Sequence, residues 1–165
     1  MKKKELTSVR FCTQGGIVAA LYVVFTLISS SLGLASGPVQ IRISESLCIL
    51  PCFFPASIPG LFIGCFFANI LTGSALPDVI AGSITTLIAA AGTHFLRFNR
   101  FLAALPPILL NTFVIPLLMI YVYHLEKGFL YFAVSIGIGE ILSAGILGQL
   151  LYSFIKNRFI SFTSK

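Results

Sequence analysis

Charged residues are scarce in this sequence, and tryptophan is absent. Only 10% of the 165 residues are charged and 57% are hydrophobic, whereas about a quarter of residues are charged in a typical soluble domain. No formal charge occurs from Phe11 to Ile41 or from Ser46 to Pro77. Since about 20 apolar residues cross the hydrocarbon core of a bilayer, this composition excludes a soluble domain. It predicts an all-α, multi-pass membrane protein.

Several catalytic and metal-binding motifs are also missing. The sequence contains no GxxxxGK[ST] motif and hence no P-loop for ATP phosphates, and His94 and His124 belong to no HExxH or other metal-ligand spacing. The four cysteines form no CxxC pair and lie in or beside apolar stretches, which favours buried hydrophobic side chains. We therefore expect a transport protein rather than an enzyme, with no metal and no cofactor. Its energy must come from an ion gradient or from another subunit.

The net charge of +6 does not indicate a nucleic-acid partner. The basic residues cluster in short segments between apolar stretches, as they do in cytoplasmic loops of membrane proteins. We therefore expect the chain to be surrounded by membrane lipid and to bind no nucleic acid.

The apolar stretches predict six helices, at residues 11–32, 43–54, 58–72, 77–95, 101–123 and 129–155. Residues 43–72 are long for one crossing and short for two, and their prolines disfavour one unbroken helix. Two crossings there place every basic residue except Arg42 and Lys127 on the side of the termini, whereas one crossing divides them almost evenly. The positive-inside rule therefore favours six crossings of a bacterial cell membrane, with both termini cytoplasmic.

One transmembrane domain is expected at residues 11–155, between a cytoplasmic N-terminal segment at 1–10 and a cytoplasmic tail at 156–165. The start of the chain also resembles a cleaved signal peptide, with a small-x-small pattern at residues 33–35. Its apolar stretch is longer than a signal-peptide core of about 7–15 residues, so we expect the first helix to be retained.

Glu140 is the sharpest candidate for a functional residue. It lies near the middle of the last predicted helix, roughly 18 Å from that helix's outer end at 1.5 Å per residue. Gly137, Ala144 and Gly148 share its helical face, and small residues allow close helix packing. Glu140 should therefore point into the bundle, where an ionisable group is a functional-site candidate. The alternative is a protonated or hydrogen-bonded packing residue.

Arg42 and Glu45 stand at the outer edge of the second predicted helix. Their spacing permits an ion pair, and both can also border an outward-facing pocket beneath the loop at residues 33–41. Asn111 lies in a proline-interrupted helix near the depth of Glu140, so a shared cavity is plausible. Gln40 and Asn69 are weaker candidates. Asp78 is a further candidate for the substrate site, although its position after Pro77 favours a cap of the fourth helix.

Small residues four apart occur in the first predicted helix, as Gly15-x-x-x-Ala19 and Gly16-x-x-x-Ala20. This pattern lets another helix backbone approach closely. From these residues alone a helix of the same chain is the favoured partner, and a helix of another protein is the alternative.

The stretch GPVQIRISESLCILPCFFPASIPGLFIGCFFAN, residues 37–69, resembles the signature region of the QueT family. The likeness continues through PDVIAGSITTLIAA, PPILLNTFVIPL and IGIGEILSAGILGQLLY, and so covers nearly the whole chain. QueT proteins are substrate-binding S components of energy-coupling-factor (ECF) importers, assigned to queuosine precursors. The resemblance implies a six-helix S-component bundle that binds its substrate from outside. Two ABC-type ATPases and a transmembrane coupling subunit would supply the energy.

The resemblance also implies roles for particular residues. The coupling subunit would dock on the first helix, where Gly15, Gly16, Ala19 and Ala20 match the family's Ala-x-x-x-Ala face, with glycine replacing the first alanine of each pair. A 7-deazaguanine base presents N1–H and an amine that one carboxylate can accept together, and 7-aminomethyl-7-deazaguanine adds a cationic amine that favours a second. Glu140 would bind the guanine-like edge and Glu45 the remaining polar rim, or the reverse. Arg42, which keeps Glu45 ionised, and Gln40 would border the pocket. Aromatic rings of this phenylalanine-rich chain would stack on the base.

Other functions remain open at this point. An S component for another vitamin or base is one alternative, since pockets differ within a shared fold. A self-contained carrier that uses Glu140 as a proton site is a second, and uptake without an ATPase would favour it. A membrane-embedded enzyme with Glu45 and Glu140 as an acid–base pair is a third, and formation of a product from a lipid or base substrate would indicate it.

Overall fold

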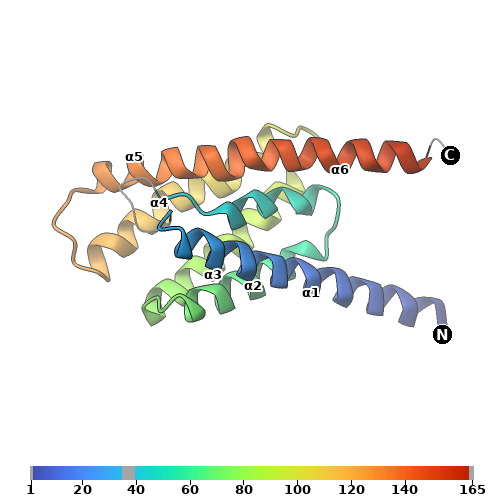
Figure 1. Ribbon diagram of the computed structural model, residues 1–165, viewed down its shortest axis with the longest axis horizontal. Helices are drawn as coiled ribbons and strands as arrows, with labels where there is room; N and C mark the ends of the chain where they lie inside the picture. The colour runs from blue at the N-terminus through green and yellow to red at the C-terminus, as the bar shows by residue number, and fades with distance from the viewer. Residues whose placement is uncertain (1, 35–39, 164–165) are drawn as a thin grey trace.

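The protein is all-helical along the residues that the computed structural model describes, 2–34 and 40–163, with side chains described at 8–34 and 40–158. The elements, in chain order, are α1 (Lys2–Ser31), η1 (Ile43–Cys52), α2 (Ser57–Leu71), α3 (Leu76–Phe95), η2 (Leu102–Ala104), α4 (Leu105–Tyr121), α5 (Phe129–Glu140), η3 (Ile141–Leu147) and α6 (Gly148–Thr163). The elements η1 and η2 are 3-10 helices, and η3 is a π-helix. The last three elements follow one another without a break and form one long rod (Figure 1).

The six predicted helices are all present, with changes at their ends. Helix α1 begins at Lys2 rather than at residue 11, and the last rod continues to Thr163 rather than ending at 155. Neither helix breaks at the expected boundary between the transmembrane domain and a cytoplasmic end segment. The division of the chain into these three parts stays a prediction.

Four helical stretches are long and apolar enough to cross a membrane: Ser8–Ser31, Leu76–Phe95, Leu102–Tyr121 and Phe129–Arg158. The elements η1 and α2 are shorter, so the count of six crossings stays a prediction. Helix α1 begins and α6 ends at the same end of the bundle (Figure 1), as an even number of crossings requires. Large apolar side chains are exposed along the outside of these helices, which suits contact with lipid.

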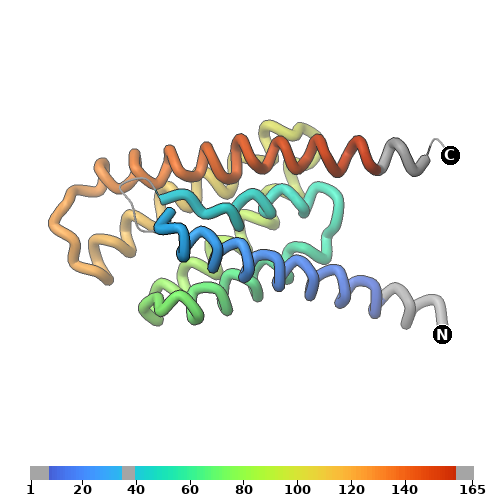
Figure 2. The backbone as a smooth tube through the Cα atoms, in the orientation of Figure 1, coloured from blue at the N-terminus to red at the C-terminus, as the bar shows by residue number. Residues whose placement is uncertain are grey.

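The element η1 lies inside the bundle rather than on its surface. All its residues from Ser44 to Pro51 are buried, and its chain runs between α1 and α6 (Figure 2). A 3-10 helix rises about 2.0 Å per residue, against about 1.5 Å for an α-helix. The 10 residues of η1 therefore extend about 20 Å, farther than an α-helix of the same length.

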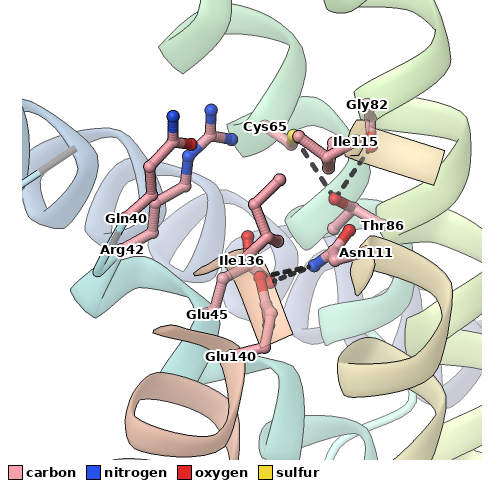
Figure 3. A pocket seen from close by; sticks show the side chains of 10 residues that line it. All are labelled: Gln40, Arg42, Glu45, Cys65, Gly82, Thr86, Asn111, Ile115, Ile136 and Glu140. Atoms are coloured by element: carbon pink, nitrogen blue, oxygen red, sulfur yellow. Dashed lines mark hydrogen bonds between the residues drawn. The ribbon is translucent and has the colours of Figure 1, made fainter. Parts of the chain in front are cut away.

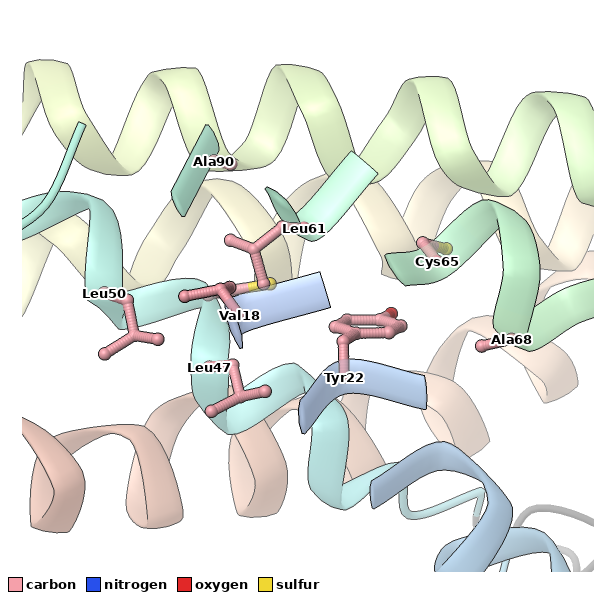
Figure 4. Close-up of a cluster of buried hydrophobic side chains, with 9 residues drawn as sticks. Val18, Tyr22, Leu47, Leu50, Leu61, Cys65, Ala68 and Ala90 are labelled. Carbon is pink, nitrogen blue, oxygen red and sulfur yellow. The ribbon is translucent and has the colours of Figure 1, made fainter. Parts of the chain in front are cut away.

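The apolar core forms where α1, α2 and η1 meet. Figure 4 shows Val18 and Tyr22 of α1 among side chains from η1 and α2, and the whole cluster comprises Val18, Tyr22, Leu47, Cys48, Leu50, Leu61, Cys65, Ala68 and Ala90. Glycines bring α1 and α2 into backbone contact beside it. A Cβ on Gly60 would lie 2.5 Å from the Gly15 carbonyl oxygen, and a Cβ on Gly64 would lie 2.8 Å from the Tyr22 Cβ. Small residues are therefore required at this crossing.

We expect the Gly60→Ala substitution to destabilise the bundle because the new methyl group meets backbone that cannot rotate away. Overpacking of this kind costs about 1–3 kcal/mol. Thermal unfolding of the purified protein in detergent would measure the loss. Gly16→Ala is the matched control, since a Cβ at Gly16 has nothing within 4 Å, and an equal loss in both variants would contradict the prediction.

Candidate functional site

A polar cavity lies inside the bundle, between elements that are far apart in the sequence (Figure 3). Its lining comes from the segment before η1 and from η1, α2, α3, α4 and α5, and consists of Gln40, Arg42, Glu45, Cys65, Gly82, Thr86, Asn111, Ile115, Ile136 and Glu140. Five of these residues, Gln40, Arg42, Glu45, Asn111 and Glu140, are candidates predicted from the sequence. The structure brings them together around one space.

The segment that precedes η1 folds inward to reach this depth. The backbone N–H of Ile43 donates to Ser29 Oγ of α1 at 3.0 Å, which holds the start of η1 against that helix. On the other side, the backbone of Gln40 packs directly on Gly139 of α5, where any Cβ would overlap the Gln40 carbonyl oxygen. Glu45 is therefore carried to the level of Glu140 instead of staying at the outer edge.

Glu45 is buried, at 2% exposure, and both of its carboxylate oxygens accept hydrogen bonds. The Tyr22 hydroxyl donates to Oε1. The Cys48 thiol donates to Oε2 at 3.2 Å, and the Asn111 amide donates to the same oxygen at 3.4 Å. Three donors therefore surround the Glu45 carboxyl group.

Glu140 has fewer partners. It is 7% exposed, its Oε1 accepts a hydrogen bond from Asn111 Nδ2 at 3.0 Å, and its Oε2 has no hydrogen-bond partner among the described residues. The same amide of Asn111 thus bridges the two carboxyl groups. Glu140 is also the last residue before the π-helix η3, and π-helical turns are frequent at functional sites. An unpaired, buried carboxyl oxygen at the wall of a cavity can accept a ligand.

The ion pair that the spacing of Arg42 and Glu45 permits is absent among the described residues. No salt bridge joins these two residues in the described part of the chain, and Figure 3 shows the Arg42 and Gln40 side chains lying side by side with their ends away from Glu45. The physical reason is local. Arg42 has extended backbone just before η1, whereas Glu45 lies in its first turn and faces Tyr22 and Asn111. The geometry instead supports the other interpretation, in which Arg42 and Glu45 both border the pocket.

Asp78 and Asn69 lie outside the cavity lining. The cap predicted for Asp78 is wrong, because α3 has Ala75 at its N-cap without a side-chain capping bond. Asp78 Oδ2 instead accepts a hydrogen bond from the Tyr123 hydroxyl at 3.1 Å, which ties the first turn of α3 to the segment just after α4. Partial burial raises the pKa of that hydroxyl, and the neighbouring Asp78 carboxylate raises it further. Asn69 donates to Cys65 Sγ at 3.5 Å and so supports the lining from behind.

Sequence reasoning missed several residues of the site. Thr86 donates to Cys65 Sγ at 3.3 Å, and Ile115 and Ile136 supply apolar surface beside the carboxyl groups. Tyr22 could have been singled out as a phenol in the middle of an apolar helix, where a hydroxyl needs a buried partner. No aromatic ring is among the described lining residues, so the aromatic ring expected to stack on the base is not located.

The cavity is narrow. The space open to the centre of a water molecule is about 10 Å³, which is room for about one water. A flat base can therefore enter only when lining side chains move. Gln40 and Arg42 precede the buried part of η1 and are the least enclosed polar residues of the lining.

The predicted docking residues of α1 fall on two faces. Gly15 and Ala19 contact α2, since a Cβ on Gly60 would meet Gly15 and one on Gly64 would meet Ala19. Gly16 and Ala20 are exposed. Beside them runs an apolar groove of about 330 Å³, lined by Phe11, Cys12, Gly15, Gly16, Ala19, Ala56, Pro59, Gly60 and Ile63. At this end of α1, one face therefore packs against α2 and the neighbouring face borders an open groove.

A helical bundle with an apolar exterior around a buried polar cavity has the architecture of a multi-pass membrane protein. The chain belongs to the QueT transporter family, whose model matches residues 12–157. Members of this family are transporters, not enzymes.

One relative is the queuosine precursor transporter QueT of Lactococcus lactis subsp. cremoris, which is 38% identical over 85 residues. That match covers 52% of this chain and 49% of the relative, so the chain spans about half of the relative's length. No solved structure matches the chain.

We expect Tyr22→Phe to destabilise the protein, because it leaves the buried Glu45 carboxylate without its Oε1 donor. Loss of such a bond costs about 1–3 kcal/mol, measured as a lower unfolding midpoint in detergent. Tyr121→Phe, at a side chain that is 73% exposed, is the matched control. Equal midpoints for both variants would show that the Tyr22 hydroxyl contributes nothing.

Proposed function

We propose that this protein is the substrate-binding S component of an ECF-type importer for a queuosine precursor, 7-aminomethyl-7-deazaguanine or a related deazaguanine base. The observation that carries the proposal is the pair of buried carboxyl groups, Glu45 and Glu140, held around one cavity by the Asn111 amide. Family membership and the name of the Lactococcus relative support the ligand class.

The two carboxyl groups suit this ligand because its donors come in two sets. The guanine-like edge offers N1–H and an exocyclic amine side by side, which one carboxylate accepts together. The aminomethyl group is a cation and favours the other carboxylate. Glu140, with its unpaired Oε2, is assigned to the guanine-like edge and Glu45 to the rest of the polar rim. Ile115 and Ile136 offer apolar surface for the faces of the ring.

Energy for transport is proposed to come from partner subunits. The sequence has no P-loop of its own, so two ABC-type ATPases and a transmembrane coupling subunit are the proposed partners. The apolar groove beside Gly16 and Ala20 is the proposed docking surface. Its small, exposed residues allow a helix of the coupling subunit to approach the α1 backbone.

We expect the purified protein, alone in detergent, to bind 7-aminomethyl-7-deazaguanine selectively over guanine and riboflavin. Glu140→Gln and Glu45→Gln should each weaken binding by about 1–3 kcal/mol, or roughly 5- to 150-fold, because each loses a charged acceptor. Equilibrium binding measures both effects.

Glu126→Gln is the matched control, since Glu126 is an exposed acid in the loop before α5 and should leave binding unchanged. Wild-type affinity in both Glu140→Gln and Glu45→Gln would rule out the proposed site. Failure of the folded wild-type protein to bind the base would rule out the proposed ligand.

Gly16→Leu and Ala20→Leu should block assembly with the coupling subunit but leave binding of the base unchanged, because both positions are exposed on α1. Co-purification of the coupling subunit measures assembly. Gly128→Leu adds the same bulk at another open position, before α5, and should not affect assembly. Normal assembly in the Gly16 and Ala20 variants would place the docking surface elsewhere.

A further inference from the structure

One basic and two acidic side chains line the central cavity: Arg42, Glu45 and Glu140. With both carboxyl groups ionised, the cavity would hold two negative charges and one positive charge in a space with room for about one water. A net charge in so dry a place is unfavourable, because little solvent can stabilise it. One proton on one carboxyl group makes the three residues neutral together.

Hydrogen bonding decides which carboxyl group carries that proton. Glu45 accepts from Tyr22, Cys48 and Asn111, and these donors stabilise a carboxylate. Glu140 accepts a single hydrogen bond, on Oε1, while its buried Oε2 has no partner among the described residues. An ionised oxygen without a donor is unfavourable in a buried site, so Oε2 of Glu140 is the position for the proton.

The other groups around Glu140 do not alter this charge count. The remaining titratable side chains that face the cavity or its carboxyl groups are a phenol and two thiols, which are neutral at pH 7: Tyr22 from α1, Cys48 from η1 and Cys65 from α2. The lining residues from α3 and α4 do not titrate: Gly82, Thr86, Asn111 and Ile115. Asp78 lies outside the lining, bonded to Tyr123.

We propose that Glu140 holds a proton on Oε2 before the ligand enters, and that a cationic ligand displaces this proton, so that binding exchanges one proton for one positive charge. The O–H bond of the carboxyl group breaks and the proton leaves to water. The electron pair stays on the carboxylate, which then accepts hydrogen bonds from the ligand. The net charge of the cavity is zero before and after binding. This inference rests on the proposed function for its ligand. The cationic amine lies beside Glu45, and its charge balances the negative charge that Glu140 gains at the guanine-like edge, so the preference for a cationic base depends on the proton of Glu140.

Calorimetry of 7-aminomethyl-7-deazaguanine binding, in two buffers of different ionisation enthalpy at pH 7, tests the exchange on the wild-type protein. We expect release of about one proton per ligand, and an affinity that tightens about tenfold per pH unit between pH 6 and pH 8. The aliphatic amine of the ligand stays protonated over this range, since such amines titrate near pH 10. A neutral base, 7-deazaguanine, should bind more weakly and release no proton.

Glu140→Gln places a neutral amide where the protonated carboxyl group stands. It should abolish proton release and the pH dependence of the affinity, whereas the control Glu126→Gln should retain both. Binding of the amine with the same heat in both buffers would overturn the proton exchange alone. Undiminished proton release in Glu140→Gln would overturn the assignment to Glu140. Absence of binding by either base would overturn the proposed function and the exchange together.

Discussion

The contact between the Gln40 backbone and Gly139 sets the depth of the whole site. Because a Cβ at residue 139 would overlap the Gln40 carbonyl oxygen, glycine is what lets the segment before η1 pass so close to α5. The bond from Ile43 N–H to Ser29 Oγ fixes the same segment on its other side. Glu45 consequently enters the interior within hydrogen-bond range of Asn111. With a larger residue at 139, the two carboxyl groups could not share one amide.

The cavity and the groove are joined through the packing of α1 on α2. Tyr22 donates to Glu45 at the cavity, and its Cβ lies where a side chain on Gly64 would have to fit. Ala19, one turn earlier on α1, contacts Gly64 and also lines the groove. A ligand that changes the bonding of Glu45 therefore acts on a side chain wedged between α1 and α2. This is a continuous set of packed contacts through which occupancy of the cavity can affect the groove.

Composition and patterning predicted the helices and the central carboxyl group because both follow from local physics. Long uncharged stretches must form helices in lipid, and small residues beside Glu140 turn it inward. The depth of Asn111 could be estimated from its position in its helix. The orientation of Arg42 and the partner of Asp78 could not, because both depend on how the chain folds back between helices. Tyr22, Cys65 and Thr86 reach the site only through helix packing, which has no local sequence pattern.

The 3-10 form of η1 helps a short buried segment to reach from the central cavity to His94 of α3. Glu45, near its start, belongs to the cavity, whereas Pro51, near its end, offers its carbonyl oxygen to His94 Nδ1 at 2.7 Å. A carbonyl can only accept, so Nδ1 carries the proton, and Nε2 is left to accept from the Arg97 guanidinium at 3.0 Å. Over the six residues from Glu45 to Pro51, an α-helix would be shorter by about 3 Å. The contact of Pro51 with His94 and that of Glu45 with Asn111 would then not both fit without a shift of the flanking chain. The longer rise of the 3-10 helix is what allows one buried segment to be anchored at both ends.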